Sequence, residues 1–138
     1  NTIVTNCSSE GNITRSAPGG GVTSIAENCE ISSCYVKGDF IGKKGDSAIG
    51  YVGGIIGDAV GSSADNCKYM GKLTSDAAAF GGIIGKADDA SSAGVTTACG
   101  FGGKINGTTV TETNLSTCAI GSATGTRGTF YLWDGVLQ

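Results

Sequence analysis

The chain has 138 residues, a formal net charge of −3 at pH 7 and only 15% charged residues, against about 25% in an average domain. It contains no run of 18 apolar residues and no basic stripe, which argues against a membrane-spanning helix and against nucleic acid as a partner. Its 25 glycines accompany one proline and 39% apolar residues, a composition that predicts many tight turns around a packed interior.

Taken in chain order, the secondary-structure signals are almost all those of short strands. They fall at residues 3–5, 51–52, 55–56, 83–84, 95–97, 109–111 and 130–132. The best helix candidate, 76–80, is one turn long and runs directly into Gly81-Gly82. Polar, glycine-rich spacers at 42–47, 61–65 and 86–92 have the composition of surface turns and loops.

One motif is written four times along the chain: cysteine, three residues, glycine, a polar residue and an apolar residue. The copies begin at Cys7, Cys34, Cys67 and Cys99, which lie 27, 33 and 32 residues apart. A double glycine with an apolar follower precedes the last three copies, at 20–22, 53–57 and 81–85. A fixed order of short apolar runs, separated by spacers of variable length, is typical of a solenoid built from one repeated unit.

Alternation within the third copy predicts which side chains face the interior. Cys67, Tyr69, Gly71 and Leu73 share one parity, whereas the residues between them share the other. The inward set is therefore the cysteine, the small residue and the terminal apolar residue. The predicted core residues are Cys34, Cys67, Cys99, Ile55, Ile83, Phe40, Leu73 and Ile105.

We therefore expect an all-β chain that folds as a parallel β-solenoid of about four to five coils, with short strands and variable loops. A single repeat domain would span residues 1–138, with repeats at about 3–15, 20–41, 53–75, 81–106 and 109–121. The segment 115–121 is interpreted as a shortened copy. The aromatic segment 128–138 is predicted to cap the last coil through Phe130, Leu132 and Trp133.

The double glycine at 53–57 followed by the cysteine strand at 66–73 resembles the GLUG repeat of bacterial surface proteins, which include IgA-cleaving metallopeptidases and adhesin-like proteins. The pattern is met well at 20–40 and less well at 81–105, and the resemblance covers about residues 3–121. It implies a non-catalytic surface or spacer module. The zinc-binding HExxH of those peptidases is absent here, as is every His, so no proteolysis carries over.

The six cysteines are open to three readings. A metal site is not favoured, because the chain has no Cys-x-x-Cys and no His. Disulfides would suit an exported protein, and stacked cysteines lie within reach of one another, but their side chains would point in parallel. We favour a reduced, buried ladder of Cys34, Cys67 and Cys99. Asn28-Cys29 resembles Asn66-Cys67, which leaves the register of the first repeat open.

Enzyme chemistry finds little support in the sequence. Without His, a Ser-His or Cys-His nucleophile pair is impossible, so no catalytic residue, cofactor or metal ligand is predicted. Three carboxylate pairs remain as the basis of a carbohydrate-acting β-helix, which is the least favoured reading. They are Glu27 with Glu30, Asp58 with Asp65, and Asp88 with Asp89.

The sequence thus predicts a non-enzymatic, extracellular β-solenoid that serves as a structural or adhesive module of a surface protein. The expected partners are neighbouring solenoid repeats or other copies of the chain, and a host or polysaccharide ligand; nucleic acid is not expected. The alternative is a subunit that assembles into an extracellular filament or surface layer, because the open ends of a solenoid carry unpaired strand groups.

Overall fold

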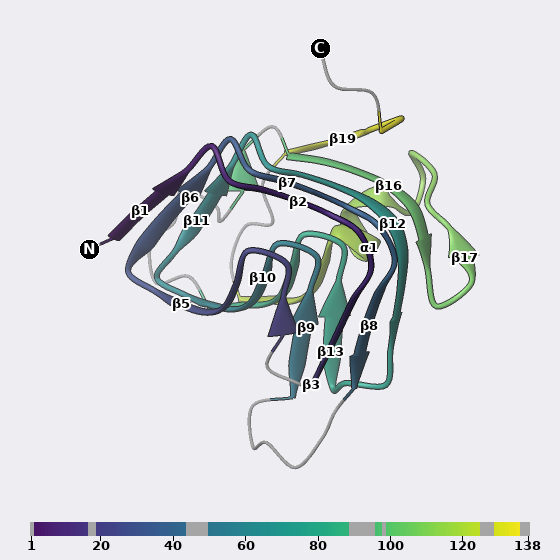
Figure 1. Ribbon diagram of the computed structural model, residues 1–138, viewed down its shortest axis with the longest axis horizontal. Helices are drawn as coiled ribbons and strands as arrows, with labels where there is room; N and C mark the ends of the chain where they lie inside the picture. Colours follow the sequence, from purple (N-terminus) through teal and green to yellow (C-terminus); the bar gives the residue numbers. More distant parts are fainter. Residues whose placement is uncertain are drawn as a thin grey trace.

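The computed structural model describes residues 2–16, 19–43, 50–88, 96–97, 99–124 and 129–135. Figure 1 shows that these residues wind into stacked, mostly parallel coils, with strand making up 64% and helix 4% of the structure. The prediction of an all-β parallel solenoid is confirmed.

The strands follow one another in the same order in each coil. The first coil contains β1 (Thr2–Thr5), β2 (Ser8–Glu10), β3 (Ile13–Ser16) and β4 (Gly19–Gly20). The second contains β5 (Thr23–Glu27), β6 (Cys29–Ser32), β7 (Tyr35–Lys37), β8 (Phe40–Lys43) and β9 (Tyr51–Gly53). The third contains β10 (Ile56–Val60), β11 (Ser63–Asp65), β12 (Lys68–Ser75) and β13 (Ala79–Gly81).

The fourth coil differs from the others after its cysteine strand. It contains β14 (Ile84–Asp88), β15 (Thr96–Thr97), β16 (Cys99–Ile105), the hairpin strand β17 (Thr108–Thr109) and the short helix α1 (Leu115–Ala119). A last, partial coil consists of β18 (Ile120–Thr124) and β19 (Phe130–Leu132). Within the described chain, β16 with β17 is the one antiparallel pair.

Stacking the coils produces four walls. Three of them follow the orders β1-β6-β11-β15, β5-β10-β14-β18 and β4-β9-β13. The fourth is formed by β2, β7, β12 and β16, which β19 extends, together with β3 and β8 beside the second half of β12. Each strand pairs with its counterpart in the next coil, so equivalent residues form columns along the solenoid (Figure 1).

The corners depend on residues that adopt left-handed backbone conformations. Asn6, Ser33 and Asn66 have φ values of 58°, 54° and 52° and immediately precede the cysteines of the first three motif copies. Asparagine tolerates this conformation better than most residues because its short polar side chain bonds locally. Asn28 has a φ of 52°, but it lies at a different corner, between β5 and β6. The Asn28-Cys29 pair is therefore not an alternative register for Cys34.

Two local predictions were wrong. The spacer 61–65 contains β11, whose Ala64 pairs in register with Ile31 of β6. A single small apolar residue between polar neighbours left no strand signal in the sequence. The helix candidate 76–80 instead leads into β13, because Ala79–Gly81 continues the wall begun by β9. Tertiary pairing overrides the helix propensity of the alanines there.

Candidate functional site

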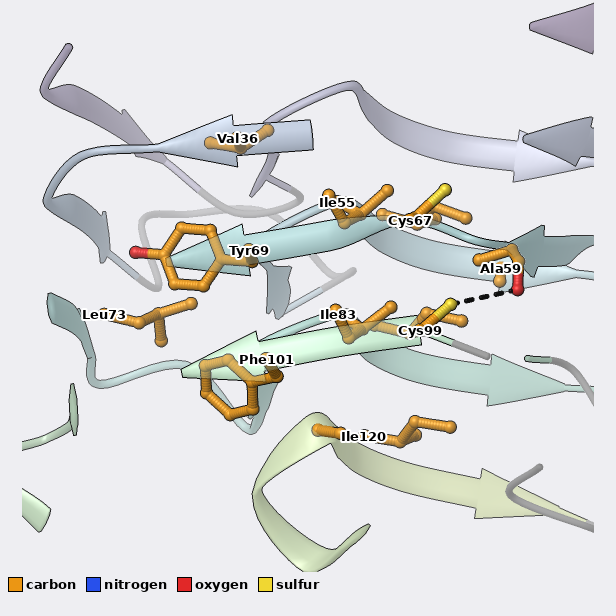
Figure 2. Packing of buried hydrophobic residues seen from close by; sticks show 14 of the residues in the cluster. Val36, Ile55, Ala59, Cys67, Tyr69, Leu73, Ile83, Cys99, Phe101 and Ile120 are labelled. Carbon is orange, nitrogen blue, oxygen red and sulfur yellow. Dashed lines mark hydrogen bonds between the residues drawn. The ribbon is translucent and has the colours of Figure 1, made fainter. Parts of the chain in front are cut away.

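The register of the cysteine strands places the four motif cysteines in one column. Ser8, Tyr35, Lys68 and Gly100, the residues that follow them, are aligned by strand pairing. Cys34, Cys67 and Cys99 are buried, whereas Cys7 in the first coil is exposed, and all six cysteines are free thiols. Figure 2 shows the Cys67 and Cys99 side chains one above the other. The column continues into Phe130, which pairs with Cys99.

The thiols of this column bond to backbone carbonyls. Cys99 Sγ donates to the Ala64 oxygen at 3.2 Å, the dashed line in Figure 2, and Cys67 Sγ lies 3.5 Å from the Ile31 oxygen. A hydrogen bond with the Cys99 thiol, and then burial, raise the pKa of Cys67 well above its ordinary value of 9.0. Burial raises the pKa of Cys34 as well. These thiols stay protonated at neutral pH, which makes them packing groups and poor nucleophiles.

The second glycine of each double glycine makes room for a large side chain of the cysteine strand in the same coil. A Cβ added at Gly54 would lie 2.7 Å from Tyr69 Cγ and 2.0 Å from the Gly82 oxygen in the next coil. The rings of Tyr69 and Phe101 stack with centroids 5.9 Å apart, as Figure 2 shows. The motif therefore encodes three glycine and side-chain contacts: Gly21 with Val36, Gly54 with Tyr69, and Gly82 with Phe101.

The motif glycine also has a structural cause. Gly11, Gly38, Gly71 and Gly103 have φ values of 121°, 137°, 156° and 105°, which side-chain-bearing residues rarely adopt. They form a column in which an added Cβ at Gly71 would lie 1.9 Å from the Gly38 oxygen. That oxygen accepts a hydrogen bond from Tyr69 Oη at 3.1 Å. Each motif residue thus packs against its copy in the adjacent coil.

The remaining predicted core residues lie inside the solenoid. Ile55, Ile83, Phe40 and Leu73 are fully buried, and Ile105 is 6% exposed at the start of the hairpin. Ile13, Phe40, Leu73 and Ile105 form one column, since each pairs with its neighbour along the stack. The core also contains alanines that the sequence did not single out, including Ala26, Ala59 and Ala87.

The aromatic segment adds a rung and then folds over the outside of the sheet. Phe130 is half-buried in the cysteine column, whereas Leu132 is 44% exposed. Trp133 is only 5% exposed, and its carbonyl lies against Gly102, where an added Cβ would be 2.1 Å from it. Gly100 is similarly covered by the Tyr131 ring. Small residues at 100 and 102 thus allow the segment to lie flat.

The carboxylate pairs do not form a shared site in the described residues. Glu27 ends β5 and Glu30 lies in β6, and Asp58 and Asp65 likewise belong to two different walls. Asp89 lies outside the described residues, so its pairing with Asp88 is not addressed. Across the part of the chain that is described, no group of three or more Cys, Asp or Glu side chains is arranged to hold a metal ion.

The segment 115–121 is placed with the double glycines and not with the cysteine strands. Gly82 N donates to the Cys118 oxygen and Ile83 N to the Ala119 oxygen, so Cys118 occupies the position of a motif glycine. Burial raises the pKa of its half-buried thiol. Cys118 also lines a cavity of about 280 Å³ beside α1, together with Phe80 and Ile105.

A second cavity of about 280 Å³ lies against the outer part of β8 and the end of β12. Ile41, Lys43, Thr74 and Asp76 are among its lining residues. Both cavities are shallow and open, and each contains at most one carboxylate. Neither one assembles the acid and base groups that hydrolysis of a glycosidic bond requires.

Sequence reasoning missed a group of lysines on the outer surface of the cysteine-strand sheet. Lys37, Lys68, Lys72 and Lys104 alternate with inward residues of β7, β12 and β16, and we call these four the lysine face. Lys72 and Lys104 are exposed and directly paired in register. Lys68 Nζ lies 5.9 Å from the centroid of the Trp133 ring. The four lysines are far apart in the sequence, so no basic run announces them.

The chain matches no family model, no curated protein and no solved structure. The resemblance to the GLUG repeat therefore stays a prediction. The single helix in the described residues, α1, has five residues, and no described helix is long and apolar enough to cross a membrane.

Proposed function

We propose that this chain is a non-enzymatic, extracellular β-solenoid that serves as a structural or adhesive module of a surface protein. The observation that carries the proposal is the continuous set of columns, in which cysteine, glycine and apolar side chains of four coils stack in register. Side chains that face inward are committed to packing. The outer walls are therefore the surfaces available to a partner.

The buried interior supports a role as a rigid spacer. Its large members are aliphatic or aromatic, and the three buried motif cysteines have thiols that burial and mutual contact keep protonated. Coils of this kind contact mainly their neighbours, so length and outer surface can vary while the core pattern is kept. The resemblance to the GLUG repeat points to the same class of module.

Immunogold labelling of intact and permeabilised cells that produce the protein tests its location. We expect antibody against the folded chain to label the outer surface of intact cells. Labelling that appears only after permeabilisation would contradict the proposal. A parallel assay for reducing-sugar release from acidic polysaccharides tests the enzyme alternative, for which the carboxylates of β5, β6, β10 and β11 would have to act.

Self-assembly into a filament or layer is the second candidate, and one observation favours it. The first coil pairs with the second along β1, β2 and β3, and the other edges of these strands carry no further strand among the described residues. Ile3, in β1, is 69% exposed. Edge strands are usually protected by lysine, proline or bulges, and an unprotected edge is a template for strand addition.

Sedimentation velocity across a range of protein concentrations, with negative-stain imaging, tests this second candidate. Ile3→Lys places a charge on the open edge and should reduce assembly without unfolding the inner coils. Val60→Lys is the matched control, because Val60 is a 39% exposed apolar residue in β10, which is paired on both sides. Monomers at every concentration in the unmodified chain would rule out self-assembly.

A further inference from the structure

The lysine face concentrates positive charge on one wall of a chain whose net charge is −3. Four of the nine Lys and Arg residues lie there, spread over β7, β12 and β16. The acidic residues nearest in register are Glu10, which pairs with Lys37, and Asp39, whose Oδ1 accepts a hydrogen bond from Lys72 N at 3.2 Å. Asp134 follows Trp133 near Lys68. These acids lie toward the first coils or at the chain end.

Lys72 and Lys104 occupy the same column one rung apart, which corresponds to about 4.8 Å between strands. Like charges placed directly opposite each other on neighbouring strands destabilise a sheet. Both side chains are exposed, so water and salt lower the repulsion, but a bound anion would convert it into an attraction. The pair is the feature of this wall that packing does not explain.

Aromatic side chains lie between the lysines. Tyr35 pairs with Lys68, and Tyr131 continues that column at the last rung with 38% of its surface exposed. The Trp133 ring lies beneath the Lys68 ammonium. Aromatic rings present an apolar face together with a polar tip, which suits the C–H faces and hydroxyl groups of sugar rings. Rows of rings and cations along a straight wall suit a linear polymer.

We propose that the lysine face binds a linear anionic polysaccharide, one that carries carboxylate or sulfate groups along its length. This inference rests on the proposed function and specifies the ligand of the adhesive module. A polysaccharide is favoured over nucleic acid because the net charge of −3 gives no long-range attraction for a dense polyanion. The wall also contains no arginine for bidentate contacts with phosphate.

Calorimetric titration and affinity electrophoresis with polygalacturonate and heparin test the inference, with dextran as the neutral control. We expect the unmodified chain to bind one of the two anionic polymers, and not dextran, with an affinity that falls as salt rises. The double variant Lys72→Gln with Lys104→Gln should weaken binding on the order of tenfold. Binding of polygalacturonate alone would assign carboxylates as the recognised groups, and binding of heparin alone would assign sulfates.

Lys43→Gln is the matched control, because Lys43 is exposed in β8 but lies outside the lysine face. It should change affinity by less than about twofold, whereas Lys104→Gln alone should weaken binding measurably. Unchanged circular dichroism of the variants would show that the fold is intact. Equal losses in Lys43→Gln and Lys104→Gln would overturn the assignment to this face.

Three other results would also overturn the inference: no binding to either anionic polymer, tighter binding to duplex DNA, or protein association without any polymer that the double variant abolishes. None of them touches the proposed function, which depends on surface location and on the lack of sugar release. Conversely, release of reducing sugar from a bound polymer would contradict the non-enzymatic module even if the lysine face binds as expected.

Discussion

Replacing Gly54 with alanine should destabilise the chain strongly, although alanine is the smallest possible addition. Gly54 does not have a positive φ, so its backbone conformation is open to alanine and the penalty is steric. The added Cβ would lie 2.0 Å from the Gly82 oxygen and 2.7 Å from Tyr69 Cγ, where ordinary contacts are 3.4–4 Å. Neither a backbone carbonyl nor a buried ring can move aside freely.

The penalty can be worked out from the bonds that hold the two coils together. Gly54 N donates to the Gly81 oxygen at 3.1 Å, and Ile55 N donates to the Ile83 oxygen at 3.0 Å. Separating the coils by more than an ångström would lose one or both bonds, at about 1 kcal/mol each. Overpacking itself costs about 1–3 kcal/mol. The expected loss is therefore about 3–5 kcal/mol, a large share of a typical domain's stability.

Urea unfolding followed by circular dichroism measures this loss as a lower midpoint at similar slope. Gly107→Ala is the matched control, because its φ is 83° but nothing lies within 4 Å of an added Cβ. That variant should lose only the cost of a left-handed backbone, about 1–2 kcal/mol. If Gly54→Ala were no more destabilising than Gly107→Ala, the proposed contact between the double glycine and Tyr69 would be refuted.

Three further predictions concern the columns. Cys67→Ser should cost about 1–3 kcal/mol and Cys7→Ser less than about 0.5 kcal/mol in urea unfolding, because only the first buries a hydroxyl; tolerance of Cys67→Lys would contradict the inward assignment. Leu73→Ala should cost about 2–5 kcal/mol and Ile13→Ala clearly less, because Ile13 is only half-buried; equal losses would contradict the column. Stability should fall as pH rises above 9.0, where unfolded thiols ionise but the folded Cys34 and Cys67 stay protonated; midpoints independent of pH between 8 and 10 would argue against the buried thiols.

The repeated columns could be predicted because strand alternation has a period of two and the motif keeps its spacing inside each copy. Cys67, Tyr69 and Leu73 share a parity, and this alone places them on one face once the segment is a strand. The wall that contains β6 and β11 could not be predicted in the same way. Its inward residues in these two strands, Ile31 and Ala64, differ in size, and polar residues surround them.

The outer surface was the least predictable part of the molecule. Lys72 and Lys104 are 32 residues apart in the sequence and become neighbours only through the register of β12 and β16. Trp133 was expected to cover the end of the last coil, yet it lies against Gly102 on the outside of the sheet. The signal was present, because the fourth motif copy has glycine at positions 100 and 102, where the third has Lys68 and Met70.

Sulfur positions in a crystal, located by anomalous diffraction, test the stacked coils most directly. The structure predicts a row of four sulfur peaks from Cys7, Cys34, Cys67 and Cys99, spaced by roughly one strand separation of about 4.8 Å. Cys29 and Cys118 should lie off this row, since neither occupies the cysteine column. Sulfur pairs about 2.05 Å apart, or four motif sulfurs scattered without a common line, would contradict the cysteine ladder and the coil register on which it depends.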